Sequence, residues 1–206
     1  MRRLFLYLLS ISLIAGCSIF RPSPKKTVSE FIESVKKMDS IKVVKLTGGL
    51  DVVNTYIGYF DVFYGVLSDD KKRELAGLLL SKLNYEIMGA SVEKNSAKVR
   101  VKITGVEKSV ILEWRSSIEI ELREKYRSEW IRKYGLFGPP PPVNFFFLAP
   151  VLSEREKNEY GQIAYTKFKN YINKSTVKSM ILIFYLDREN SSWIVNEYSE
   201  IFEYFL

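Results

Sequence analysis

Apolar residues recur every three or four positions over much of the chain, which is the spacing of helices that bury one face. The first such stripe runs through Val28, Phe31, Ile32, Val35 and Met38. The same spacing predicts further helices over 41–46, 69–83, 109–134 and 153–173, and the stripe of the 109–134 helix is expected to stay buried as far as Tyr134. The segment 50–67 is rich in aromatic and β-branched residues and its periodicity is ambiguous; it is also interpreted as a helix.

Polar residues mark where several of these helices begin. Ser23 before Pro24, or Thr27 three residues before Glu30, supplies the side-chain cap and first turn that open a helix, and the sequence leaves both starts open. The later starts are Ser68 for the helix over 69–83, and Ser153 with Glu156 as a capping box for the helix over 153–173.

Two segments switch to the period of two that is typical of strands with one buried face. Ala97, Val99, Val101 and Ile103 alternate with polar residues, and they follow a turn at 94–96 and a shorter alternation through Tyr85, Ile87 and Gly89. A second hairpin is predicted from the apolar run at 176–187, the turn at 190–192 and the segment 193–198. Helices and hairpins in this order predict an α+β fold.

The amino-acid composition excludes several classes of enzyme and metal site. The chain has 206 residues, 47% of them hydrophobic, with no histidine and a single cysteine. A Ser-His-Asp hydrolase, a Cys-His protease and a His-ligated metalloenzyme are excluded, and an internal disulfide or a Cys-rich zinc site cannot form. We therefore predict no catalytic residue, no metal site and no cofactor.

The one cysteine, Cys17, follows a pattern of its own. Arg2 and Arg3 precede an apolar run at 4–15, which is too short to span a membrane and is typical of a signal peptide. Ile14-Ala15-Gly16-Cys17 resembles the bacterial lipobox. The resemblance implies cleavage between Gly16 and Cys17 and acylation of Cys17. An ordinary signal peptide or an N-terminal anchor with an incidental cysteine is the alternative.

These features divide the chain into a signal peptide at 1–16, a lipidated cysteine and tether at 17–26, and one α+β domain at 27–206. Removing Arg2 and Arg3 lowers the net charge from +7 to +5. We expect an exported protein held by its lipid on a bacterial membrane: the outer leaflet of the plasma membrane, or the outer membrane where the source has two. The charge favours anionic headgroups or wall polymers as neighbours over nucleic acid.

Three stretches, 24–39, 85–106 and 192–195, resemble small bacterial lipoproteins of the nuclear transport factor 2-like (cystatin-like α+β) fold, many of which are domains of unknown function. The resemblance implies a cone-like domain in which N-terminal helices pack in a curved antiparallel sheet, with a helical insertion between two hairpins. It implies that Trp193 and Val195 lie on the final strand. The segment 135–173 departs from the pattern and is interpreted as the insertion.

Four features carry competing interpretations. Asp61 and Tyr64 are either an acid–base pair or structural residues, and the proline run at 139–142 is either a recognition arm or a stiff connector. Phe145, Phe146 and Phe147 either contact a membrane or partner or plug the mouth of the cone. The basic group Lys167, Lys169, Lys174 and Lys178 is either a contact for anionic polymers or a solvated helix face.

We therefore expect a non-enzymatic, lipid-anchored envelope protein that binds another envelope protein or a small apolar ligand. The alternative is an enzyme of hydratase, isomerase or cyclase type that uses a Tyr/Asp/Glu pocket. Family enzymes of this fold use Asp–His or Tyr–Asp pairs, and the absence of histidine leaves only the second.

Overall fold

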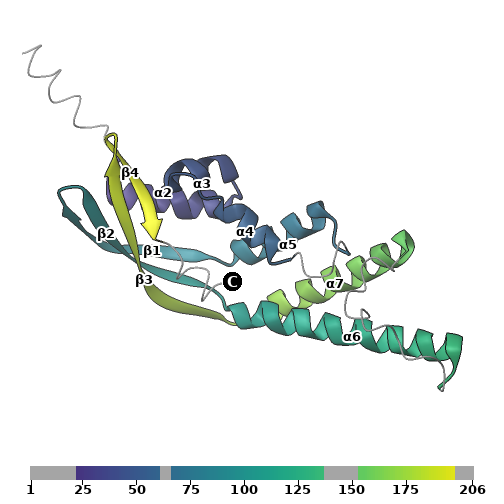
Figure 1. Cartoon of the computed structure of the whole chain (residues 1–206). Coiled ribbons are helices and arrows are strands. Elements are labelled where there is room, and N and C mark those ends of the chain that lie inside the picture. The colour runs from purple at the N-terminus through teal and green to yellow at the C-terminus, as the bar shows by residue number, and fades with distance from the viewer. Residues whose placement is uncertain (1–21, 61–65, 137–152, 198–206) are drawn as a thin grey trace, which may run out of the picture.

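The computed structural model describes residues 22–60, 66–136 and 153–197 (Figure 1). In this part of the chain, helices cover one side of a four-stranded antiparallel sheet whose order is β1-β2-β3-β4. The α+β prediction is therefore confirmed. The helices are α2 (Pro24–Lys36), α3 (Ser40–Thr47), α4 (Val52–Gly58), α5 (Asp69–Ser81), α6 (Lys108–Tyr134) and α7 (Glu154–Lys174), and the strands are β1 (Asn84–Glu93), β2 (Ser96–Val106), β3 (Val177–Glu189) and β4 (Ser192–Glu197).

The sheet consists of two hairpins that pair along their inner strands. The register between β2 and β3 runs without interruption from Ser96 opposite Asp187 to Val106 opposite Val177. Between Ile87 and Gly89 of β1 the register shifts, so that Gly89 lies opposite Arg100. The predicted alternation is seen in the burial of Tyr85, Ile87 and Gly89, which are partly buried between exposed neighbours. The bulge shifts the register of the following residues by one, and the strand is exposed from there to its end.

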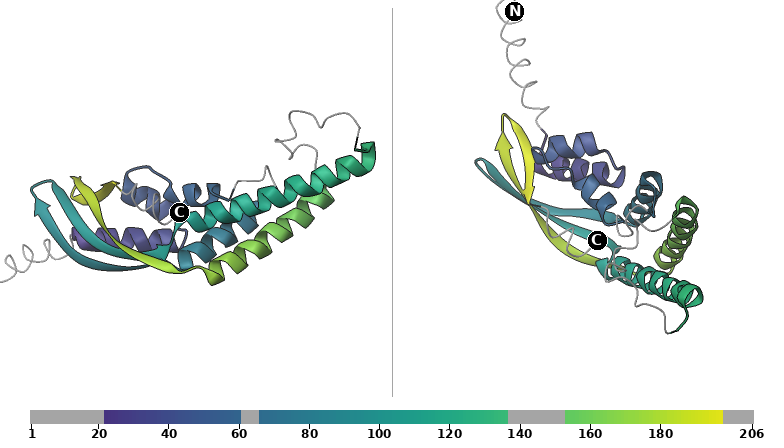
Figure 2. Two further views of the ribbon diagram at one scale, coloured as in Figure 1. Left: turned by 90° about the horizontal axis from the view of Figure 1, so that it is seen from below. Right: turned by 45° about the vertical axis from the view of Figure 1, so that its right-hand side comes forward.

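The strands curve around α2, which lies in the concave side of the sheet (Figure 2). Ser23 is the N-cap of this helix and its side chain accepts a hydrogen bond from the Lys26 amide, with Pro24 in the first turn. Thr27, the alternative start, is a buried residue inside the helix. The Phe31 ring meets the Phe184 ring of β3 edge to face at 6.1 Å, so the first predicted stripe does face the sheet.

Helices α3, α4 and α5 pack next to α2 on the concave side of the sheet (Figure 1). Asp39 caps α3 and Asp51 caps α4, each through its side chain, and Ser68 caps α5 as predicted. Gly48 ends α3 with a φ of 69°, a left-handed conformation that glycine adopts without a Cβ clash. The prediction of one helix over 50–67 is wrong in its extent: α4 ends at Gly58, residues 59–60 form a turn, and residues 66–67 form a bend. Residues 61–65 lie outside the described ranges.

Helices α6 and α7 form an antiparallel pair between the two hairpins and project from one end of the sheet (Figures 1 and 2). Trp114 of α6 and Phe168 of α7 lie 5.0 Å apart, centroid to centroid, and Phe60 contacts both rings. The first part of the α6 stripe, with Ile111, Trp114 and Ile118, is buried as predicted. Tyr134 at its far end is 41% exposed, so the expectation that the stripe stays buried to that point is wrong. The reason is that α6 extends beyond the hydrophobic core.

Candidate functional site

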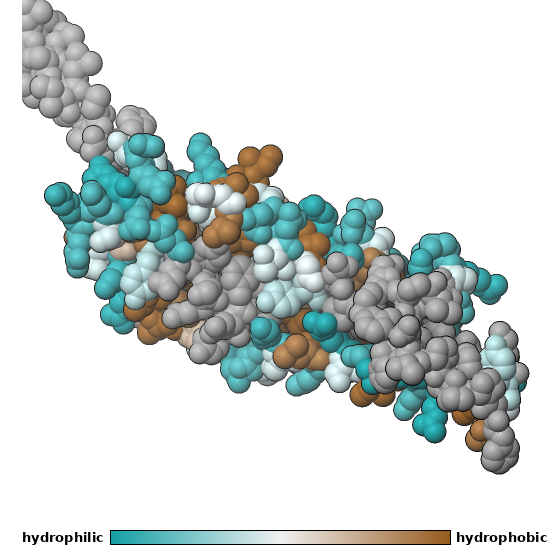
Figure 3. All heavy atoms as spheres, in the orientation of Figure 1, coloured by the Kyte–Doolittle hydropathy of each residue, from teal (hydrophilic) through white to brown (hydrophobic). Residues whose placement is uncertain are grey.

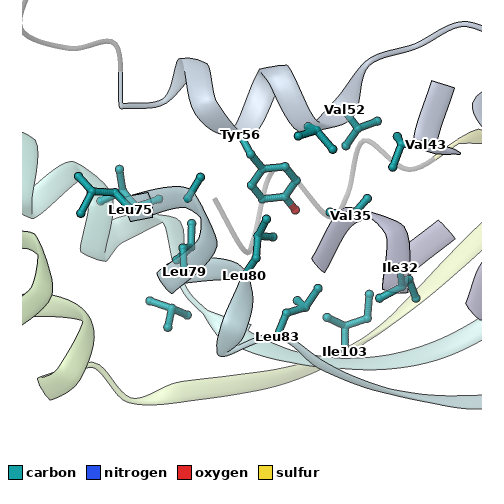
Figure 4. Close-up of a cluster of buried hydrophobic side chains, with 14 of the residues drawn as sticks. Ile32, Val35, Val43, Val52, Tyr56, Leu75, Leu79, Leu80, Leu83 and Ile103 are labelled. Carbon is teal, nitrogen blue, oxygen red and sulfur yellow. The ribbon is translucent and has the colours of Figure 1, made fainter. Parts of the chain in front are cut away.

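The concave side of the sheet, where a cone-shaped domain would hold a pocket, is filled by side chains. Figure 4 shows Ile32 and Val35 of α2 with Leu80, Leu83 and Ile103 in one cluster, and Tyr56 of α4 pointing into it. All of these residues are buried. Burial raises the pKa of the Tyr56 hydroxyl, and the neighbouring Tyr59 raises it further, so this phenol stays protonated near neutral pH. The described part of this interior is therefore an apolar core.

An open groove lies instead between α6 and α7, near the end of the pair that joins the sheet. Its volume is about 690 Å³. The first turns of α6 form one wall, and the last turns of α7 with the segment leading into β3 form the other. The lining residues are Glu107, Ser109, Val110, Glu113, Ser117, Lys167, Asn170, Tyr171, Lys174, Ser175 and Thr176.

Ion pairs fix the two walls of the groove relative to each other. Lys167 of α7 pairs with Glu121 of α6, and Lys178 at the start of β3 pairs with Glu107, 2.7 Å from Nζ to Oε1. Further along the helices, Lys125 pairs with Glu159 at 3.7 Å. Partly exposed pairs of this kind contribute little stability individually, but they define how the helices are placed side by side.

The groove can form hydrogen bonds with a ligand in both directions. Hydroxyl groups of Ser109, Ser117 and Tyr171 both donate and accept, and the Asn170 amide does the same. Glu113 and Lys174 add one charge of each sign. Such a lining suits a polar segment of a partner or a hydroxylated molecule better than an apolar ligand.

The four basic residues predicted as a group on and after α7 have different contacts in the structure. Lys167 and Lys178 are engaged with carboxylates of α6 and its N-cap, Lys169 lies over the Tyr165 ring at 5.1 Å, and Lys174 lines the groove. The four residues therefore do not form a single basic patch. Lys167 and Lys178 therefore form contacts within the protein.

A second surface feature was missed at the sequence level. Ile181, Ile183 and Tyr185 of β3 point to the convex side of the sheet and are partly exposed, whereas Leu182 and Phe184 between them are buried. The continuous apolar run at 180–185 contained this signal, because a half-buried strand alternates with polar residues and this one does not. Figure 3 shows hydrophobic residues at the surface over β3, at the lower left of the view, bordered by hydrophilic ones.

Several predicted site residues lie outside the described residues. These are the lipidation and cleavage residues Cys17 and Gly16, the Asp61 and Tyr64 pair, the proline run at 139–142, and Phe145, Phe146 and Phe147. Within residues 22–60, 66–136 and 153–197, no group of three or more Asp, Glu, Cys or His side chains is arranged to hold a metal ion. None of the described helices is long and apolar enough to cross a membrane.

No protein-family model matches the chain, and no curated protein matches it. Among solved structures, the chain is similar to the crystal structure of YcdA from Bacillus subtilis, described there as a "putative lipoprotein", with a TM-score of 0.47 and 15% sequence identity. The match covers 89% of this chain and 54% of YcdA, so the chain spans about half the length of that protein.

Proposed function

We propose that this protein is a lipid-anchored protein of the bacterial cell envelope whose α+β domain, of the nuclear transport factor 2-like (cystatin-like) type, binds a partner without catalysing a reaction. The acylated residue is Cys17, after removal of 1–16 as a signal peptide. The tether predicted at 17–26 would then be shorter, because α2 already begins at Pro24, and the described domain would stand outside the membrane on the residues between Cys17 and Ser23.

The observation that carries the binding role is that the domain offers a groove on its surface and a packed core in its concave side. An enzyme of the cone type needs a pocket in which acidic groups and a tyrosine converge. Tyr56 and its neighbours Ile32, Val35 and Leu80 occupy that position as core residues. The polar groove between α6 and α7 is the more open site, and it supports binding of a polar segment of another envelope protein.

The position of the groove also supports this role. Helix α2, which follows the tether, begins toward the end of the sheet that carries the hairpin turns, and α6 and α7 extend from the opposite end (Figure 2). A helix of 27 residues such as α6 is about 40 Å long at 1.5 Å per residue. The helix pair would therefore reach partners at some distance from the anchor.

The anchor is tested by Cys17→Ser in the source or in a bacterial host. We expect the variant to lose labelling by a radioactive fatty acid and either to leave the membrane fraction or to accumulate uncleaved, because the sulfur that accepts the lipid is gone. Ser18→Ala is the matched control and should behave as the unaltered chain. Normal processing and membrane fractionation of Cys17→Ser would show that the lipoprotein assignment is wrong.

The groove is tested by photocrosslinking in intact cells from Ser117, and from exposed Ile120 one turn further along α6 as the control. We expect a discrete crosslinked protein from Ser117 that is absent with Lys174→Ala and Asn170→Ala together. Equal products from both positions would contradict a specific site in the groove.

A further inference from the structure

The convex side of the sheet carries two parallel rows of different chemistry. The β2 row is basic and the β3 row is apolar. The register places Lys98 opposite Tyr185, Arg100 opposite Ile183, and Lys102 opposite Ile181. We call these six residues the basic–apolar face.

The apolar row is exposed to a degree unusual for its residue types. Ile181 is 49% exposed, Ile183 is 39% exposed and Tyr185 is 37% exposed. The described helices lie on the opposite side of the sheet, so none of them covers this row (Figure 2). One contact joins the two rows directly: the Lys98 Nζ lies 5.5 Å from the centre of the Tyr185 ring. Long basic side chains that lie along apolar neighbours keep their charges at the outer surface.

The carboxylates on this side of the sheet lie at the margins of the face. Glu86 of β1 is opposite Lys102, and Glu197 of β4 is opposite Tyr185 in the register. Gly89 and Ser91 occupy the β1 positions opposite Arg100 and Lys98. Ser96, at the hairpin turn, has Glu93 and Asp187 as its neighbours on the two adjoining strands, and the Asn196 side chain donates to Asp187. The centre of the face is therefore a row of three cations beside three apolar side chains.

We propose that the basic–apolar face docks on the surface of an anionic phospholipid bilayer. The cations would contact phosphate and other anionic headgroup oxygens, and Ile181, Ile183 and Tyr185 would enter the boundary between headgroups and acyl chains. Surfaces that bind this boundary combine basic residues with apolar and aromatic ones, and both contributions add to the affinity.

Charge argues for a bilayer over a second copy of the chain. Two copies meeting through this face would bring two rows of Lys98, Arg100 and Lys102 close together, and like charges at such a distance repel. An anionic bilayer presents opposite charge and an apolar layer at the same surface. The proposal is helped by the proposed lipid anchor, because the tether would hold the domain near the bilayer at high effective concentration.

The experiment uses the full chain carrying Cys17→Ser, so that an introduced cysteine is its only thiol and lipidation plays no part. An environment-sensitive fluorophore is attached at Ile183→Cys on the face, or at Ile41→Cys on α3. Ile41 is 86% exposed and lies on the helix side of the sheet. Vesicles contain phosphatidylcholine alone, or phosphatidylcholine with phosphatidylglycerol, each with a headgroup-labelled lipid that quenches the fluorophore.

With anionic vesicles we expect quenching at position 183 and none at position 41, and with phosphatidylcholine alone we expect no quenching at either. Any binding of the apolar segment at 4–15 is common to both labelled chains and cannot produce this difference. Lys98→Gln, Arg100→Gln and Lys102→Gln together should lower the ratio of docked to undocked protein about a hundredfold, since each basic residue near an anionic surface contributes about fivefold. Lys37→Gln, Lys42→Gln and Lys45→Gln together remove the same charge from exposed positions on the helix side and should have no effect.

Three results would overturn the proposal. One is equal quenching at both positions, and another is unchanged quenching after the three substitutions on β2. The third is a fluorophore at position 183 that is already buried without vesicles, because another part of the chain or a second copy would then cover the face. Circular dichroism of each variant confirms that it is folded. Since all these chains lack Cys17, their behaviour is separate from the outcome of the lipidation test.

Discussion

The indole Nε1–H of Trp114 donates a hydrogen bond to the backbone carbonyl oxygen of Ala164, at 2.9 Å. This bond joins α6 to α7 inside the protein, where Phe60 and Phe168 surround the indole. A buried indole N–H without an acceptor is costly, so the bond specifies how the two helices are placed along each other. The groove depends on that placement because its two walls belong to these helices.

Trp114→Ala should lower the free energy of unfolding by about 3 to 5 kcal/mol, because it leaves a large cavity in the aromatic cluster. Trp114→Phe retains a ring but loses the hydrogen bond, and we expect a smaller loss of about 1 to 3 kcal/mol. Ile120→Ala, at an exposed position of the same helix, is the control and should change stability by less than about 0.5 kcal/mol. Urea unfolding followed by tryptophan fluorescence and circular dichroism measures all three. Similar losses from Trp114→Ala and Ile120→Ala would contradict a packed junction between the helices.

Gly161→Ala should destabilise the protein by about 1 to 3 kcal/mol. A Cβ atom at Gly161 would lie 2.4 Å from the carbonyl oxygen of Val66, so the backbone of α7 or of the segment before α5 would have to move. Gly77→Ala is the matched control, also within a helix, where the new Cβ would be 3.7 Å from the Met38 sulfur. It should stabilise by up to about 1 kcal/mol because alanine favours the helix. The midpoint of thermal unfolding of the two variants measures both effects. A higher midpoint for Gly161→Ala would show that α7 does not approach Val66 so closely.

The capping box that begins α7 should make stability depend on acid pH. Glu156 accepts hydrogen bonds from the side chain and backbone amide of Ser153, and these bonds hold the pKa of its carboxyl below the ordinary value. A lowered pKa in the folded state means that the stabilisation is present above the unfolded pKa and is lost as pH falls through the folded one. Ser153→Ala should cost about 1 kcal/mol near neutral pH and less in acid.

The Glu156 titration can be followed directly by NMR. In Ser153→Ala its midpoint should move up toward that of an unperturbed glutamate. Glu154→Gln, in the same first turn but outside the box, should leave the Glu156 midpoint close to its original value. An unchanged midpoint in Ser153→Ala would mean that the serine does not cap the helix in solution.

Alkaline pH should unfold the protein through Tyr56. Burial raises the pKa of this phenol in the folded state, so the unfolded chain releases the proton first and stability is lost as pH rises above about 10. Tyr56→Phe removes the titrating group and should move the alkaline unfolding transition to higher pH. Tyr165→Phe, at a partly buried position of α7, should leave that transition in place. Identical alkaline transitions in all three proteins would argue against Tyr56 as the responsible group.

Much of the fold follows from local patterns. The alternation through Val99, Val101 and Ile103 predicted β2 and its buried face, and the serine caps at positions 68 and 153 set the starts of α5 and α7 within one residue. Trp193 and Val195 are buried on β4, which lies in the segment predicted as the second strand of that hairpin. These predictions succeed because caps and strand alternation are determined by near neighbours in the chain.

The remaining features depend on distant segments. The bulge after Ile87 shifts the pairing of β1 with β2 by one residue, and nothing in its immediate sequence requires it. Helical spacing showed that one face of α6 is apolar but not where its partner helix ends, so the exposure of Tyr134 was missed. The groove depends on the pairing of α6 with α7, which a single helical pattern does not define. Likewise, the basic–apolar face exists only because the register places Lys98 beside Tyr185.

The uninterrupted pairing of β2 with β3 has a consequence for how this domain can vary. The two strands are neighbours over their full length, from the hairpin turns to Val106 opposite Val177, although α6 and α7 lie between them in the chain. The strand pairing is thus complete without the helix pair. The two helices can be lengthened or shortened from the end that lies away from the sheet without altering the register of the strands. Each seven residues added to both helices would extend the pair by about 10 Å. The length of the helix pair α6 and α7 therefore sets the distance between the anchored end and the far end of the domain. That distance can change while the sheet stays the same.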